Sequence, residues 1–144
     1  MADEFNLNRF VTAQETVYVS VLHELATGEK TSHWMWFIFP QLRGLGRSST
    51  ASFYGIASEA EASAYWRHPV LGARLLECCT AILRIKGKTA LEVFGSPDDM
   101  KLRSSMTLFE RAAADVSVFA QVLDRYFGGR RDGRTLERLG GAKA

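Results

Sequence analysis

The chain has 144 residues, of which 47% are hydrophobic and 24% charged, and its formal net charge is +2. This length allows about one domain with a substantial core, and the composition is that of an ordinary globular protein. The near-neutral charge gives no indication of a nucleic-acid or membrane partner, and no apolar run approaches the roughly 18–20 residues that cross a bilayer. Residues 1–4 are acidic, unlike a secretory signal. Cys78 and Cys79 are typical of reduced core thiols, so we expect a cytoplasmic protein.

The first expected element is a long amphipathic helix. Apolar residues recur at helical spacing from Leu7 to Leu25, Asn6 is a suitable N-cap, and Gly28 is a suitable stop. Gln14 interrupts the apolar stripe, and an inward-facing amide needs hydrogen-bond partners. Two interpretations stay open for Gln14: it ties two helices together, or it lines a polar pocket.

Residues 30–46 hold two of the three tryptophans together with a histidine, a glutamine and two loop glycines. Ser32 is a candidate cap for a short helix that ends before Pro40. Because apolar residues lie on all its sides, this helix is predicted to be central and buried. The glycines at 44–46 are flanked by basic and hydroxyl side chains, a composition that suits an anion such as phosphate. A plain loop is the alternative, and no strand pattern precedes the glycines, which excludes a dinucleotide fingerprint.

The rest of the chain predicts further helices separated by glycine, proline and capping residues. They are expected at 49–56, 58–67, 69–86, 89–94, about 96–109, 115–127 after a cap at Asp115, and 135–139, where a final turn folds back as a lid. No stretch alternates apolar and polar residues in the manner of a strand. We therefore predict an all-α fold, with residues 1–144 forming a single compact domain of six to eight helices around one core.

The order of these motifs resembles one known family. The resemblance is carried by Arg9-Phe10, Ala13-Gln14, residues 30–41, Gly44-Leu45-Gly46, residues 68–72, Asp99, Lys101 and residues 104–109. Over about residues 5–139, followed by a short tail at 140–144, the chain is similar to the bacterial domain-of-unknown-function family 1810, whose members are often labelled calpastatin in error. This resemblance implies a small helical cytosolic protein and brings no established activity. The inward glutamine, the aromatic motif and the late lysine-bearing helix also resemble, more distantly, the helical superfamily that processes ADP-ribose and NAD derivatives.

The first functional hypothesis is a polar-aromatic pocket that binds a small nucleotide-derived or ADP-ribose-like ligand, with hydrolysis as an open extension. A tryptophan would stack on a base or ribose, and the glutamine amides would hydrogen-bond to the polar edges of the ligand. Cations, including Arg47, would contact phosphate. The candidate catalytic residues are His33, whose unperturbed pKa near 6.5 suits acid–base chemistry, and Lys101. The candidate ligand-binding residues are Gln14, Lys30, Trp34, Trp36, Gln41, Arg43, Gly44, Gly46, Ser48 and Ser104.

Two other functions stay open. The protein could be a non-enzymatic interaction or regulatory module that forms a homodimer through an aromatic patch, or a structural protein whose polar network fixes its packing. We expect no cofactor and no metal, because the three histidines are scattered and the sequence has no HExxH or CxxC pattern. Nucleic-acid binding is not expected either, because no basic stripe is interleaved with aromatic residues.

Overall fold

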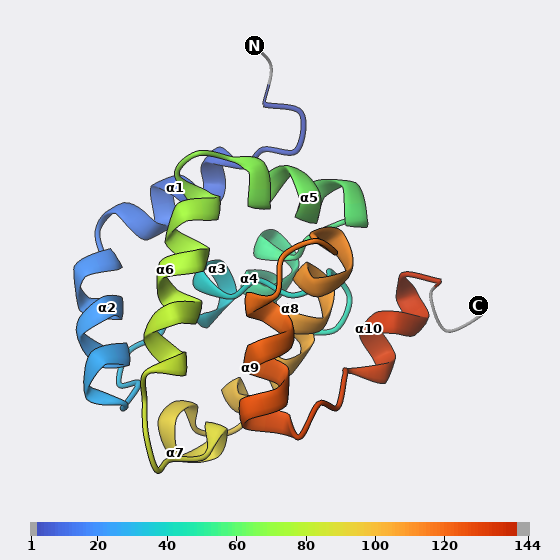
Figure 1. The fold of residues 1–144 in the computed structure, drawn as a ribbon. Coiled ribbons are helices and arrows are strands. Elements are labelled where there is room, and N and C mark those ends of the chain that lie inside the picture. The colour runs from blue at the N-terminus through green and yellow to red at the C-terminus, as the bar shows by residue number, and fades with distance from the viewer. Residues whose placement is uncertain (1–2, 141–144) are drawn as a thin grey trace.

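The structure is a computed structural model that describes residues 3–140, and these residues form ten helices and no strand (Figure 1). The helices are α1 (Asn8–Glu15), α2 (Tyr18–Thr27), α3 (Met35–Ile38), α4 (Ser49–Tyr54), α5 (Glu59–Arg67), α6 (Leu71–Leu83), α7 (Ala90–Phe94), α8 (Asp98–Ala112), α9 (Val118–Phe127) and α10 (Gly133–Arg138). The all-α prediction is confirmed. The count exceeds six to eight because the first predicted helix is divided and several one- or two-turn segments are helical. Of the expected tail at 140–144, residues 141–144 lie outside the described residues.

The predicted first helix is two helices, α1 and α2, which are separated at Thr16 and Val17. Helix α1 packs against α3, whereas α2 packs against α6. Because both halves bury an apolar face, the helical periodicity continues across the break and conceals it. Asn6 is not the N-cap, since the carboxylate of Asp3 accepts the first free N–H groups of α1. Gly28 ends α2 in a left-handed conformation, as predicted.

Helix α8 is the centre of the packing. It contacts α5, α7, α9 and α10, and in Figure 1 α6 and α9 run side by side with α8 behind α9. Leu102, Met106, Leu108 and Phe109 of α8 are fully buried in the core. Among residues 3–140, no helix is both long enough and apolar enough to cross a membrane.

Several predicted helix starts differ from the structure, and α10 begins at Gly133 rather than Thr135. Helix α3 is one turn whose N-cap is Trp34 rather than Ser32. Helix α6 begins at Leu71 rather than Pro69, because the His68 imidazole accepts the N–H groups of Val70 and Leu71 and so takes the place of a cap. Helix α9 begins after Ser117, and Asp115 does not cap it.

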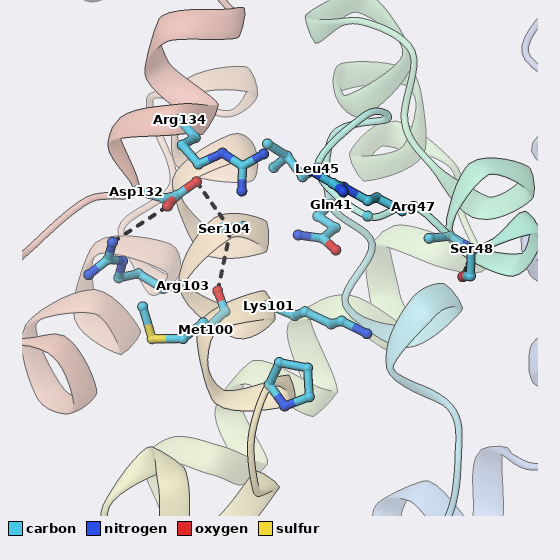
Figure 2. Close-up of a pocket in the computed structure, with 13 residues that line it drawn as sticks. Gln41, Leu45, Arg47, Ser48, Met100, Lys101, Arg103, Ser104, Asp132 and Arg134 are labelled. Atoms are coloured by element: carbon cyan, nitrogen blue, oxygen red, sulfur yellow. Dashed lines mark hydrogen bonds and ion pairs between the residues drawn. The ribbon is translucent and has the colours of Figure 1, made fainter.

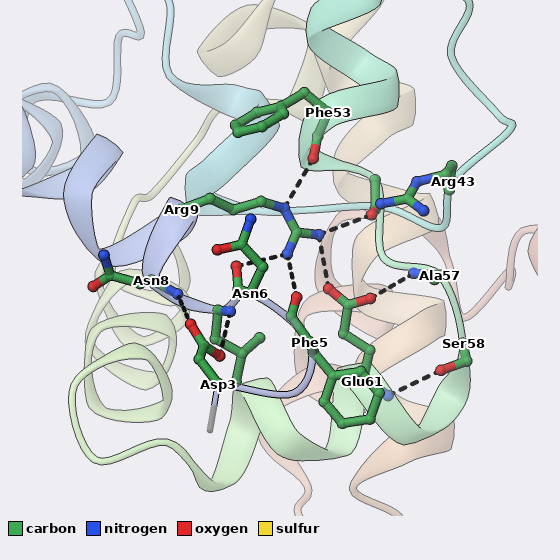
Figure 3. Close-up of polar contacts among 12 residues, drawn as sticks. Asp3, Phe5, Asn6, Asn8, Arg9, Arg43, Phe53, Ala57, Ser58 and Glu61 are labelled. Atoms are coloured by element: carbon green, nitrogen blue, oxygen red, sulfur yellow. Dashed lines mark hydrogen bonds and ion pairs between the residues drawn. The ribbon is translucent and has the colours of Figure 1, made fainter. Parts of the chain in front are cut away.

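A buried ion pair joins the N-terminal segment to the entry of α5 (Figure 3). Arg9 Nη2 lies 2.7 Å from Glu61 Oε2, and the two residues are only 8% and 2% exposed. The guanidinium also donates to four backbone carbonyls, those of Phe5, Asn6, Phe53 and Gly55. Glu61 in turn accepts the N–H of Ala57 at 2.9 Å. With its donors paired in this way, the buried charge is compensated, and the segment between α4 and α5 is fixed in place.

Candidate functional site

The loop before α3 is organised around a buried carboxylate. Glu24 of α2 accepts the backbone N–H groups of Thr31 and Ser32, the Ser32 hydroxyl and the Trp34 indole N–H. Burial alone would raise the pKa of Glu24, but these hydrogen bonds outweigh the burial and lower it to about 2. The loop that carries Lys30 and His33 is therefore folded around an ionised glutamate.

The loop after α3 is held by backbone pairing to the segment between α4 and α5. Arg43 N–H donates to Ile56 O at 2.7 Å, and Ile56 N–H donates to Gln41 O at 3.0 Å. Gly46 follows where the loop touches α4, and a Cβ there would lie 2.6 Å from the Cβ of Ala51. Glycine therefore allows the loop to approach α4, and this contact places Gln41 and Gly46 in one wall of a cleft.

The cleft has a volume of about 600 Å³ and lies between the 41–48 loop, the first turns of α8 and the start of α10 (Figure 2). Its lining combines cations, hydroxyls, an amide and a few apolar groups, namely Gln41, Leu45, Gly46, Arg47, Ser48, Ala51, Pro97, Met100, Lys101, Arg103, Ser104, Asp132 and Arg134. This volume is in the usual range for a small-molecule site.

Asp132, in the lining of the cleft, anchors α10 to α8. Its carboxylate accepts the Ser104 hydroxyl at 3.1 Å, the Thr135 N–H at 3.0 Å and the Thr135 hydroxyl at 2.5 Å, and lies 3.5 Å from Arg103. Burial raises the pKa of Asp132, but the hydrogen bonds from Thr135, Ser104 and Arg103 outweigh it and leave the pKa below its ordinary value. The one acidic group of the cleft is therefore ionised and already occupied.

The charge of the cleft is strongly positive. Four cations line it against one carboxylate, and that carboxylate is shared with Arg103. Arg47 and Arg134 are exposed and have no ion-pair partner within residues 3–140. Lys101 lies 3.6 Å from Asp98, a long contact. A concave surface with unpaired cations, hydroxyls and an amide is suited to an anion with hydrogen-bond acceptors, such as phosphate.

A smaller hollow of about 270 Å³ adjoins the cleft and shares Pro97 and Lys101 with it. Its other lining residues are Lys30, His33, Met35, Trp36, Ser96 and Asp98. Lys101 Nζ lies 5.4 Å from the centre of the Trp36 ring, within cation–π range. His33 is exposed and forms no hydrogen bond with the part of the chain that the structure describes. A planar group entering the hollow would therefore meet an aromatic ring and an unengaged imidazole.

The structure thus brings together most of the residues predicted to form a site, in two adjoining spaces. Gln41, Gly46, Ser48 and Ser104 line the cleft, while Lys30, His33 and Trp36 line the hollow; Lys101 is common to both. Lys30 is a special case, because its ammonium is already held 2.7 Å from Asp98 and 5.0 Å from the centre of the Trp34 ring. The Lys30 ammonium is therefore already paired within the protein, and it is poorly available to bind a ligand.

Four predicted ligand-binding residues do not line either space. Gln14 is buried, and its amide donates to Phe37 O at 2.7 Å and to the Tyr65 hydroxyl at 3.1 Å, while its oxygen accepts from Arg74 at 3.3 Å. It therefore ties helices together, the first of the two interpretations. The Trp34 indole is also buried and bonded to Glu24.

The other two residues that line neither space belong to the 41–48 loop. The Arg43 guanidinium donates to Ser52 O of α4 at 3.1 Å. Gly44 adopts φ 97° beneath Arg138, whose guanidinium a Cβ would approach to 2.8 Å. Arg43 therefore contacts α4, and Gly44 contacts α10.

Sequence reasoning missed the three charged residues Arg103, Asp132 and Arg134 of the cleft, besides several apolar residues of its lining. Arg103 and Ser104 are adjacent in α8, and the sequence showed that this helix mixes cations with hydroxyls. Asp132 and Arg134 lie in a basic segment that reads as a solvated tail. The one sequence signal was that Asp132 precedes Thr135 by three residues, the spacing of an N-cap. This signal predicts a short helix, but it does not show what the helix packs against.

Comparison with known proteins establishes the relationships of the chain. The family model described as "Protein of unknown function (DUF1810)" matches residues 4–139. The chain belongs to this family. It is also similar, at 52% identity and a TM-score of 0.95, to the crystal structure of the conserved hypothetical protein Rv1873 from Mycobacterium tuberculosis, with 96% of this chain and 99% of that chain covered. No curated protein matches it. Membership of the DUF1810 family confirms the predicted family resemblance and carries no activity with it.

Proposed function

We propose that the cleft binds a small phosphate-bearing molecule of the nucleotide-derived, ADP-ribose-like class. The observation that carries this proposal is the lining of the cleft, where four cations face a single carboxylate that is itself occupied. Phosphate oxygens would contact Arg47, Lys101 and Arg134. Ser48 and Gln41 would supply hydrogen bonds to phosphate or ribose.

The adjoining hollow supports the nucleotide-like part of the proposal. Trp36 offers a half-buried aromatic surface beside the phosphate cleft, and stacking on a tryptophan suits a base or another planar ring. Lys101 lines both spaces, so one ligand that spans them would touch Lys101 near its middle.

We extend the proposal to hydrolysis, with His33 as the acid–base group and Lys101 as the group that stabilises negative charge. His33 is exposed to the hollow with neither ring nitrogen engaged by residues 3–140, so both are available for proton transfer. The His33→Gln variant should bind the ligand as the wild type does and release no product from it. Equal product release by both proteins would remove His33 from this role.

Thermal unfolding in the presence of AMP, ADP, ATP, ADP-ribose and NAD tests the binding proposal. A ligand at a hundredfold excess over its Kd stabilises the native state by about 2.7 kcal/mol. We expect ADP-ribose or a related member of the panel to raise the Tm, and Arg47→Ala to reduce the rise.

The matched control is Arg43→Ala, which removes an arginine from the same loop but from outside the cleft. It should leave the ligand-induced rise unchanged. A flat panel, or an equal loss of the rise in both variants, would contradict the proposal and favour a structural or interaction role for the DUF1810 fold.

A further inference from the structure

The cations of the cleft are divided between two walls. Figure 2 shows Arg134 extending from α10 towards the loop that carries Leu45 and Arg47, and Lys101 extending from α8 below Gln41. Arg47 and Arg134 have no ion-pair partner in the described part of the chain, and Lys101 has only its 3.6 Å contact with Asp98. The structure therefore offers three largely uncompensated cations around one space.

One phosphate group does not match this arrangement. A phosphomonoester carries about −1.5 to −2 charges at neutral pH, fewer than the three cations present. Arg103 adds a further donor, because its Nε is buried and has no hydrogen-bond partner among residues 3–140. A second phosphate would supply the missing charge and the acceptor oxygens that reach both walls.

Arg134 is positioned by its neighbours rather than by contacts of its own. Asp132 and Thr135, on either side of it in sequence, are buried and bonded to each other, and Asp132 also accepts the Ser104 hydroxyl. The backbone at Arg134 is thereby held against α8, while the side chain is exposed and uncommitted. Because the backbone is already fixed, ligand binding would cost only the conformational entropy of the Arg134 side chain.

Resting on the proposed function, we infer that the cleft selects ligands that carry a diphosphate, and that Arg134 is the specificity-determining residue that binds the second phosphate. A ligand with one phosphate would be held by Arg47 and Lys101 alone. A diphosphate would bridge these two residues to α10.

Isothermal titration calorimetry with ADP and AMP, and with inorganic pyrophosphate and orthophosphate, tests the inference. The wild type should bind the diphosphate of each pair at least tenfold more tightly. Arg134→Gln should bring each pair close to parity by weakening the diphosphate alone. The control is Arg130→Gln, which removes an exposed arginine four residues away that does not line the cleft, and it should keep the wild-type preference.

Two results would overturn the inference: equal wild-type affinity within both pairs, or an Arg134→Gln variant that weakens mono- and diphosphates by the same factor. In either case binding itself would survive, so the proposed function would stand. If neither the nucleotides nor the free anions bind to the wild type, the proposed function falls together with the inference. Thermal unfolding of both variants without ligand checks that each is folded.

Discussion

The buried Glu24 carboxylate gives a prediction whose size follows from the structure. Its pKa is lowered from 4.5 to about 2 by hydrogen bonds from Ser32, Thr31 and Trp34, which outweigh the opposing effect of burial. One pKa unit corresponds to about 1.36 kcal/mol, so ionised Glu24 contributes about 3 kcal/mol to the free energy of unfolding at pH 7. Because the folded pKa is the lower one, this contribution is complete above pH 4.5 and is lost as the pH falls towards 2.

The Glu24→Gln variant isolates this contribution. Glutamine retains one acceptor oxygen, and the Ser32 hydroxyl can rotate to accept from its amide, so shape and pairing change little while the charge disappears. We expect the variant to be about 3 kcal/mol less stable than the wild type at pH 7. At pH 3 the difference should fall to about 1 kcal/mol, because the wild-type carboxylate then loses most of its advantage.

Urea unfolding followed by tryptophan fluorescence at pH values from 7 to 3 measures the difference. The exposed Glu29, whose carboxylate forms no hydrogen bond or ion pair within residues 3–140, provides the control variant Glu29→Gln, which should have the stability of the wild type at each pH. A Glu24→Gln deficit that stays constant from pH 7 to pH 3 would refute the reasoning, because it would show that the cost is one of packing rather than of charge.

Three further predictions concern the core. Arg9→Met should cost about 3–5 kcal/mol in urea unfolding at pH 7, because it leaves Glu61 buried and unpaired, and adding Glu61→Leu should recover part of that loss; a double variant as weak as the sum of both singles would argue against the pair. Gln14→Leu should lose about 1–3 kcal/mol of stability and keep wild-type ligand affinity in calorimetry, since Gln14 lies outside the cleft. Burial raises the pKa of the Cys78 thiol to about 12 and raises that of Cys79, so both should resist iodoacetamide at pH 8 until the chain is unfolded; rapid native alkylation would contradict this.

The helical class and several helix ends could be predicted from the sequence, because they depend on local chemistry. The capping box of Thr89 and Glu92, the left-handed stop at Gly128 and the Ser58 cap are all short-range interactions. The break between α1 and α2 could not be predicted, because both halves bury an apolar face and only their packing partners differ. His68 was unexpected as a helix cap because an imidazole rarely takes that position.

The parts of the candidate site that are formed by residues close together in sequence could be predicted. The 41–48 loop and the first turns of α8 were recognised from their glycines, cations and hydroxyls. Gln14 and Trp34 were drawn into the predicted site because a buried polar group looks the same in sequence whether a ligand or the protein satisfies it; here Phe37, Tyr65 and Glu24 do so. Arg134 could not be predicted, because its place in the cleft depends on Asp132 docking α10 onto α8.

A titration of 15N-labelled protein with ADP-ribose, in which the shift of each backbone amide signal is followed, tests directly whether the cleft binds this ligand. We expect the largest shifts at residues 41–48, in the first turns of α8 around Lys101, and at the start of α10 around Arg134. Saturating shifts confined to another face, or a spectrum that does not change at millimolar ADP-ribose, would contradict this expectation.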